Sequence, residues 1–174
     1  MRSMAQVVSS NNLKAAAENE GQALLITGRN GAGKSSLLRM VGGLVRIAGG
    51  RLDLTGSNPE LSIAEQAHYL GHQDALKPAL TVAENLDFWA RIYGVPRSER
   101  PARIERALAA VELGSRRDDP VGTYSGGMRR RLNLGCALVS EPRLVLLDEP
   151  TVGVDPQSRV HVFEAVRNLR AQGI

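Results

Sequence analysis

Residues 28–35 combine glycines, a lysine and a serine at a spacing that can hold phosphate. The segment reads Gly-Arg-Asn-Gly-Ala-Gly-Lys-Ser and fits the pattern G-x-x-x-x-G-K-[ST]. Glycines permit the backbone angles that turn successive N–H groups toward an anion. In such a loop the lysine reaches the terminal phosphates and the serine hydroxyl can hold Mg²⁺. The predicted cradle consists of Gly28, Asn30, Gly31, Ala32, Gly33, Lys34, Ser35 and Ser36.

A pair of acids forms the second chemical feature. Asp148 and Glu149 follow the apolar run 144–147, which is typical of a strand buried on both faces. An acid at the carboxyl end of such a strand, beside a phosphate-binding loop, can hold Mg²⁺ through water. The next carboxylate can orient or deprotonate an attacking water. We therefore predict that Asp148 is a metal ligand and Glu149 a catalytic residue.

A second glycine-rich turn, Ser125-Gly126-Gly127, opens another predicted helix. Its backbone N–H groups, its hydroxyl and the positive helix end could all face an anion. An ordinary N-cap with flexible glycines explains this segment equally well. Two such helix starts, far apart in one chain, favour a nucleotide held between two surfaces.

Strands and helices alternate at both ends of the chain, and a helical block lies between them. This alternation favours an α/β fold with a mostly parallel sheet. A capping box at Thr81 and Glu84 starts the helical block. The predicted strands are 23–27, 51–55, 68–71 and 144–147. The predicted helices are 34–48, which Gly49-Gly50 closes, two helices between 81 and 113, and the helices 125–139 and 158–172. The last helix is expected to bury Val162, Phe163, Val166 and Leu169 and to end at the cap Gly173.

Composition limits the chain to one domain with a largely aliphatic core. It has 174 residues, a net charge of +4 and a single cysteine, Cys136, which is expected to be a buried apolar residue. No apolar run approaches the ~18 residues that span a bilayer, and the first residues lack a signal-peptide pattern. Arginines cluster around 97–106, 116–117 and 129–131. Such clusters are solvated helix faces by default, but they could also attract a membrane surface, nucleic acid or nucleotide phosphates.

Taken together, the motifs resemble the ATP-binding subunit of an ABC (ATP-binding cassette) transporter, from about Ala23 to the end. The matching segments are the Walker A motif at 28–35, Gln73 of the glutamine loop, the signature motif at 125–127, the Walker B motif at 144–148, the catalytic Glu149 and the D-loop at 152–155. The resemblance implies a P-loop NTPase fold with ATP and Mg²⁺ as cofactors, and Gln73 as a further contact to Mg²⁺. It implies one domain over 1–174, with a core lobe at about 20–73 and 139–174 and a helical subdomain at about 74–138.

The same resemblance implies ATP hydrolysis coupled to transport through separate membrane-spanning subunits. A second ATP-binding subunit would join head to tail, so that each ATP lies between Lys34, Ser35 and Asp148 of one chain and the signature motif of the other. The chain would then sit peripherally at the cytoplasmic face of the cell membrane. No nucleic acid is expected. Family members that act in DNA repair carry long coiled coils between the P-loop and the signature motif, and no heptad stretch separates residues 35 and 125 here. A soluble ABC ATPase acting on nucleic acid or the ribosome is the alternative that the arginine clusters keep open.

Two segments resemble different subfamilies. Residues 68–86 are similar to the haem exporter ATPase of cytochrome c maturation. Residues 124–159 look more like the drug- and polysaccharide-type export ATPases. Haem export and another kind of export are therefore both open, and the sequence does not identify the transported substrate.

Several positions depart from the family pattern. No aromatic residue precedes Tyr69 to stack on adenine, and Met128 stands where the signature motif usually has glutamine. The family's switch histidine would follow Ile174, so we expect a cassette truncated at its C-terminus, and a fragment that binds nucleotide without turnover is a third alternative. None of the three histidines, His68, His72 and His161, matches the switch position. They are predicted to be surface or loop groups, and a metal site at any of them would need further ligands.

Overall fold

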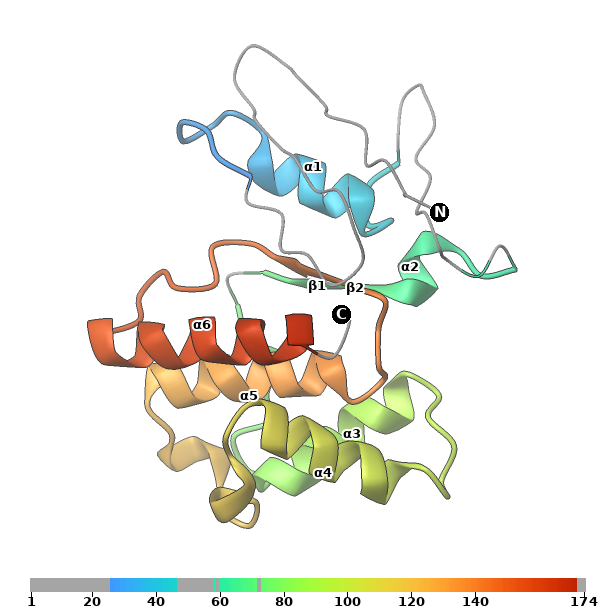
Figure 1. Cartoon of the computed structure of the whole chain (residues 1–174), viewed down its shortest axis with the longest axis vertical. Helices are drawn as coiled ribbons and strands as arrows, with labels where there is room; N and C mark the ends of the chain where they lie inside the picture. Colours follow the sequence, from blue (N-terminus) through green and yellow to red (C-terminus); the bar gives the residue numbers. More distant parts are fainter. Residues whose placement is uncertain (1–25, 47–57, 59, 72, 172–174) are drawn as a thin grey trace. The chain divides into compact units, whose positions relative to one another are not determined.

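The computed structural model describes residues 26–46, 58, 60–71 and 73–171 (Figure 1). The helices are α1 Lys34–Val41, α2 Ile63–Gln66, α3 Val82–Ile92, α4 Arg100–Ala110, α5 Gly126–Leu138 and α6 Pro156–Ala171, with 3₁₀ turns η1 Gly114–Arg116 and η2 Val121–Thr123. The strands are β1 Ala67–Leu70 and β2 Leu144–Leu147. The predicted strand 51–55 and the glycines at 49–50 and 173 lie outside the described residues, as does most of the strand predicted at 23–27.

The elements fall into two compact units. The first comprises residues 1–69, 143–148 and 170–174, and the second comprises residues 70–142 and 149–169. The first therefore holds α1, α2, β2 and most of β1, and the second holds α3, α4, α5 and most of α6. Within the described parts of both units, no helix is long and apolar enough to cross a bilayer.

In the first unit, β1 and β2 are neighbours in a parallel sheet. The residues just before them are already joined, because the Arg143 N–H donates to the Gln66 carbonyl at 3.0 Å. The strands predicted at 68–71 and 144–147 are thus confirmed, but the expected burial of the second on both faces is wrong. Only Leu146 of its four residues is buried. That side chain lies under the end of α1, where a Cβ on Gly42 would be 3.1 Å from Leu146 Cδ1.

Helix α1 is shorter than predicted. It ends at Val41 rather than continuing to the glycines at 49–50. Gly43 has φ +70, and the Leu44 N–H donates to the Arg39 carbonyl at 2.8 Å, which is the Schellman arrangement that terminates helices. A glycine with this conformation two residues after Val41 therefore stops the helix before the apolar pattern runs out.

The second unit is helical, as predicted for the block between residues 81 and 139. Its core is aliphatic, and the fully buried side chains include Leu86, Leu108, Val111, Leu132 and Val139. The capping box is confirmed. The Thr81 N–H donates to Glu84 Oε2 at 2.8 Å, and the Glu84 N–H donates to Thr81 Oγ1 at 3.2 Å. Cys136 is buried on α5, as expected, and burial raises the pKa of its thiol.

The buried face of α6 agrees with the prediction only in part: Val162 is buried as expected, and the side chain of Leu169 lies outside the described residues. Val162 and Ala165 are buried, whereas Phe163 is 51% exposed and Val166 is half-buried. Successive helical residues are separated by about 100°, so a stripe through Val162 and Ala165 leaves Phe163 on the neighbouring, solvent-facing side. The prediction counted apolar residues along the segment and gave too wide a buried face.

Asn85 ties the loop before α3 to that helix. Its side chain is fully buried, accepts from the Lys77 N–H at 2.8 Å, and donates to the carbonyls of Lys77 at 3.0 Å and Thr81 at 2.9 Å. We predict that Asn85→Ala lowers the free energy of unfolding by about 1–3 kcal/mol, because the backbone groups of Lys77 and Thr81 lose the part-buried hydrogen bonds that Asn85 supplies. Denaturant unfolding measures this. The exposed Asn58→Ala is the control, and an equal effect of both changes would contradict the prediction.

Candidate nucleotide-binding site

The predicted phosphate cradle surrounds the start of α1. Gly31 and Gly33 have φ values of +80 and +91, which side chains strongly disfavour. A Cβ on either glycine would meet nothing within 4 Å, so their role is conformational rather than spatial. Gly33 is also the N-cap of α1, and the loop therefore precedes the positive end of a helix.

Lys34 is held against this loop. Its Nζ donates to the carbonyl of Gly28 at 3.0 Å and to that of Arg29 at 3.1 Å. The ammonium group thus lies at the start of the predicted cradle. Carbonyl oxygens are neutral acceptors, whereas a phosphate oxygen carries charge and forms the stronger hydrogen bond. The lysine can therefore exchange its loop contacts for a phosphate group.

The carboxylate of Asp148 lies beside the same helix start. It follows β2 directly and is only 8% exposed. Ser35 Oγ donates to its Oδ1 at 3.0 Å, although the two residues are 113 positions apart. A hydroxyl and a carboxylate are the hard oxygen ligands that Mg²⁺ prefers, and neighbouring oxygens around Mg²⁺ are about 2.9 Å apart for bonds of about 2.1 Å. This donor pair therefore fits a magnesium ion.

Tyr69 completes the set of hydroxyl donors and was not predicted. Its Oη donates to Asp148 Oδ2 at 2.6 Å, and Arg39 Nε donates to Tyr69 Oη at 3.3 Å. Burial raises the pKa of Tyr69, and its hydrogen bond to Asp148 raises it further, so the phenol keeps its proton. The positions of Tyr69 and Asp148 could have indicated this contact, because residues near the carboxyl ends of adjacent parallel strands meet at one edge of the sheet.

The remaining predicted residues belong to the second unit. Ser125 caps α5 by accepting from the Met128 N–H at 3.3 Å, and both Ser125 and Gly126 are exposed. Gly127 is buried, and a Cβ there would lie 2.2 Å from Ser158 of α6. This glycine is therefore required for helix packing, a reason that the sequence pattern did not reveal.

Gln73 and Glu149 lie on two segments that a single arginine connects. Arg130 of α5 donates to the carbonyls of Gly71 at 2.8 Å, Glu149 at 3.0 Å and Pro150 at 2.9 Å. Next to it, Arg129 makes a two-point ion pair with Asp74, at 2.9 and 3.0 Å. Helix α5 thus holds the segments that carry the predicted glutamine, Gln73, and the predicted catalytic acid, Glu149.

Glu149 itself has an unusual backbone. Its side chain is exposed and its φ is +52, in the left-handed region. A residue with a side chain is strained there by roughly 1–2 kcal/mol. Arg130 offsets this strain because it binds the Glu149 carbonyl, and the strained position sets the direction in which the side chain leaves the chain.

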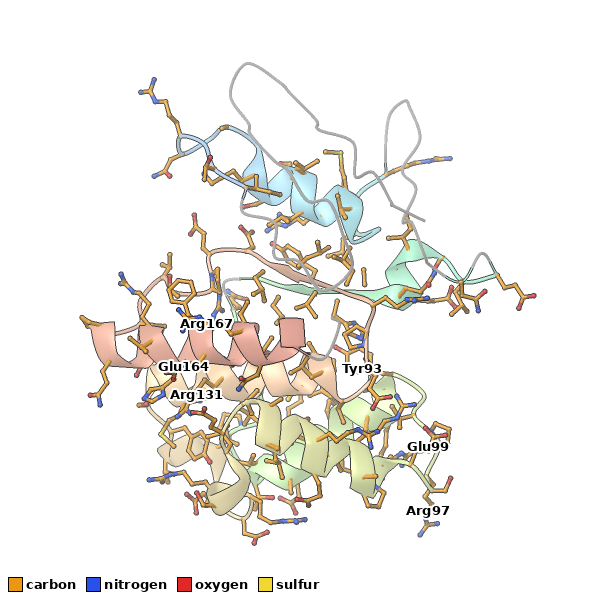
Figure 2. All side chains as sticks on the ribbon, in the orientation of Figure 1. Tyr93, Arg97, Glu99, Arg131, Glu164 and Arg167 are labelled. Atoms are coloured by element: carbon orange, nitrogen blue, oxygen red, sulfur yellow. The ribbon has the colours of Figure 1, made fainter. Side chains whose placement is uncertain are left out.

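The arginine clusters are largely paired within the second unit. Glu99, labelled in Figure 2, accepts from Arg103 at 2.7 Å, and Arg116 donates to Asp119 at 3.1 Å. Further ion pairs join Arg106 to Glu141, Arg117 to Glu105, and Arg131 to Glu112. Charges engaged in this way attract an external polyanion less strongly than the sequence suggested.

The structure therefore groups the predicted site residues in two sets. Lys34, Ser35 and Asp148 come together in the first unit, and Tyr69 joins them. The second unit contains Gln73, the 125–127 turn and Glu149.

We predict that Tyr69→Phe weakens the binding of Mg²⁺ with nucleotide several-fold, because Asp148 loses the donor that orients it. Isothermal titration calorimetry with and without Mg²⁺ measures this. Tyr124→Phe is a matched control, since its hydroxyl donates to the Arg116 carbonyl at 3.2 Å in the second unit. Equal affinities for Tyr69→Phe and the unmodified chain would contradict the positioning role.

Comparisons with known proteins identify the family of this chain. The sequence profile of the ABC transporter family matches residues 13–152. The linearmycin resistance ATP-binding protein LnrL of Bacillus subtilis is 42% identical over 158 residues, which are 89% of this chain and 51% of LnrL. The chain thus spans about half the length of LnrL. The cytochrome c biogenesis ATP-binding export protein CcmA of Nitrobacter winogradskyi is 51% identical over 143 residues, which are 82% of this chain and 69% of that protein.

A solved structure confirms the fold. CbiO1 of Clostridium perfringens, part of the ABC transporter complex cbiONQ, superposes with a TM-score of 0.75 over 99% of this chain and 74% of its own. Its sequence identity is 22%, so the likeness concerns the fold alone. The predicted α/β P-loop fold is therefore confirmed.

Proposed function

This chain belongs to the ABC transporter family, and we propose that it is an ATP-binding and ATP-hydrolysing subunit of an exporter. The observation that carries the proposal is the contact between Ser35 and Asp148 at 3.0 Å. It joins the phosphate-binding loop to the acid at the end of β2, and both motifs are needed to bind a nucleotide with its metal.

Lys34, Ser35 and Asp148 of the first unit would each have a role in holding ATP. The loop N–H groups and the start of α1 would bind the phosphates, and Lys34 would move from the carbonyls of Gly28 and Arg29 to the β- and γ-phosphates. Ser35, Asp148 and Gln73 would hold Mg²⁺, with Tyr69 orienting Asp148. Bound Mg²⁺ would neutralise negative charge on the phosphate oxygens.

Hydrolysis would depend on Glu149. Its carboxylate would accept a proton from a water whose oxygen attacks the γ-phosphorus, while the bond from that phosphorus to the ADP oxygen breaks. Arg130 is a positioning residue in this scheme, because it fixes the backbone on which Glu149 is carried.

The exposed Ser125 and Gly126 support a composite site made by two copies. In a head-to-tail dimer, each ATP would lie between the loop of one chain and this turn of the other, so nucleotide binding would close the dimer. Separate membrane-spanning subunits would carry the substrate, and the chain would bind them at the cytoplasmic face of the membrane.

The relatives suggest two export substrates. The printed name of CcmA refers to cytochrome c biogenesis, and that of LnrL to linearmycin resistance. We favour export of haem for cytochrome c biogenesis because CcmA has the higher identity, 51% against 42%. Restored cytochrome c maturation in cells that lack their own CcmA would support this choice, and restored linearmycin resistance in cells that lack LnrL would support the other.

Catalysis by Glu149 predicts a separation of binding from turnover. Glu149→Gln should retain ATP binding but lose about 10²–10⁴-fold in ATPase rate, the contribution expected of a general base. Lys34→Ala should lose ATP binding itself. Glu141→Gln is the control, since Glu141 also has a left-handed φ of +56 but pairs with Arg106. Unchanged turnover in Glu149→Gln would remove Glu149 from the mechanism.

The composite site predicts dimers that depend on nucleotide. Glu149→Gln with Mg²⁺ and ATP should elute from a size-exclusion column at twice the monomer mass, since the ATP that holds the dimer closed is not hydrolysed. Adding Ser125→Arg should prevent the dimer, because a bulky cation replaces an exposed hydroxyl, while each monomer still binds ATP. A dimer that tolerates Ser125→Arg would exclude this interface.

A further inference from the structure

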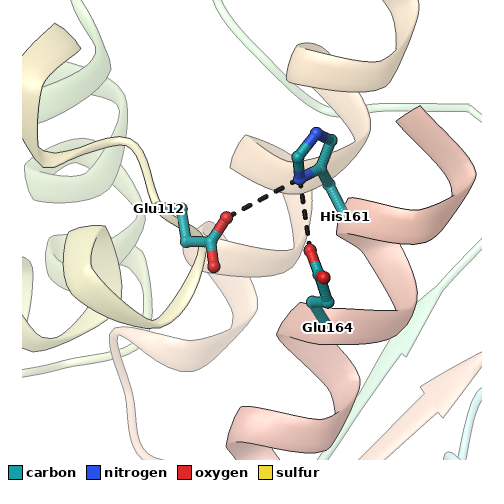
Figure 3. A group of neighbouring side chains, drawn as sticks. All are labelled: Glu112, His161 and Glu164. Carbon is teal, nitrogen blue, oxygen red and sulfur yellow. Dashed lines mark ion pairs between the residues drawn. The ribbon is translucent and has the colours of Figure 1, made fainter. Parts of the chain in front are cut away.

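Three potential metal ligands converge in the second unit, and none of them is among the residues proposed to bind ATP (Figure 3). His161 Nδ1 lies 3.3 Å from Glu164 Oε2 and 3.7 Å from Glu112 Oε2. The three ligand atoms all lie within 4.8 Å of one another. Two carboxylates therefore face one ring nitrogen.

The backbone explains why these side chains meet. His161 and Glu164 are three residues apart on α6, so they lie on the same helix face. Glu112 follows α4 with φ +55, and the Leu113 N–H donates to the Leu108 carbonyl at 3.0 Å. A helix end of this type is usually made by glycine, and here it turns a glutamate toward α6.

The state of His161 indicates what the cluster can hold. Its Nδ1 is shielded from solvent and has no hydrogen-bond partner among the described residues, although two carboxylate oxygens lie near it. A buried ring nitrogen without a partner is costly, and a coordinated cation would satisfy it together with both carboxylates. A proton on Nδ1 is the competing solution.

The distances fit one cation in particular. Zinc binds histidine and carboxylate ligands at about 2.0–2.2 Å in a tetrahedron, which places neighbouring ligand atoms about 3.3–3.5 Å apart. The two distances from Nδ1, 3.3 and 3.7 Å, are close to this spacing. Magnesium and calcium prefer sets made of oxygen alone, so the imidazole favours zinc.

We propose that Glu112, His161 and Glu164 form a zinc site, with water in the fourth position. The only thiol of the chain cannot compete, because Cys136 is buried and burial raises the pKa of its thiol. Zinc bound here links α6 to the end of α4, and it therefore stabilises the helical unit.

Arg131 opposes the metal and provides a sensitive test. Its Nη1 is 3.9 Å from Glu112 Oε2, and it also donates to the Val111 carbonyl at 3.3 Å (Figure 2 labels Arg131 and Glu164). A cation at this distance reduces the affinity of Glu112 for a second cation. Removing its charge should therefore strengthen zinc binding, which a purely structural role of the cluster would not produce.

The experiment titrates the metal-free chain with Zn²⁺ in the presence of excess Mg²⁺. Calorimetry should give one zinc per chain, the melting temperature should rise, and Co²⁺ as a probe should give the visible spectrum of a tetrahedral site with a nitrogen ligand. His161→Gln and Glu164→Gln should each weaken zinc binding at least ten-fold, and Arg131→Gln should strengthen it. Circular dichroism would verify that the variants fold.

Control variants separate this site from others. His68→Gln and Glu105→Gln remove a histidine and a glutamate outside the cluster and should leave zinc binding unchanged. Asp148→Asn should also leave it unchanged, since that residue belongs to the proposed magnesium site. Zinc binding that persists in His161→Gln, or that is lost in Asp148→Asn, would overturn the proposal, as would the absence of zinc binding to the unmodified chain.

Discussion

The buried carboxylate of Asp148 is the constraint on which the rest of the site depends. A charged group with 8% exposure must be hydrogen-bonded, and its two oxygens accept from Ser35 and Tyr69. One hydroxyl comes from the first turn of α1 and the other from β1, so satisfying this charge fixes the phosphate-binding loop against the two strands. Folding and the proposed metal binding thus use the same atoms, which explains how an acid proposed to bind metal is tolerated in a poorly solvated place.

In the second unit, helix α5 has a similar role, because it holds separate segments of the chain together. Its N-terminal turn carries the exposed serine proposed to face the nucleotide of a second copy, and Arg129 and Arg130 hold the segments that follow β1 and β2. A movement of α5 would therefore move the Gln73 segment and the Glu149 backbone with it. This arrangement offers a direct physical link between the Gln73 segment and the placement of the proposed catalytic acid.

The sequence predicted most of the elements and the family, because the motifs depend on local chemistry. The phosphate-binding loop needs glycines with positive φ, and the capping box at Thr81 needs only neighbours three residues apart. The family identified from these motifs is confirmed. Predictions that depended on packing were less successful: α1 ends earlier and Phe163 is exposed. Short helix α2 was missed, although Ser62 and Glu65 form a capping box that signals it.

By itself, the sequence determined which groups could do chemistry. These are Lys34 and Ser35 of the loop, the acid pair Asp148 and Glu149 after β2, and the glycine-rich turn 125–127 at the start of α5. Residue type and short spacing are enough for that, since each motif is built by consecutive residues. Only the tertiary structure decided which distant groups share a partner. Tyr69 on Asp148, Arg130 on carbonyls from two segments, and Glu112 beside His161 all join residues at least 19 positions apart. No local pattern encodes such contacts, because they form only when the folded chain brings buried charges and unpaired backbone groups next to partners that are distant in the sequence.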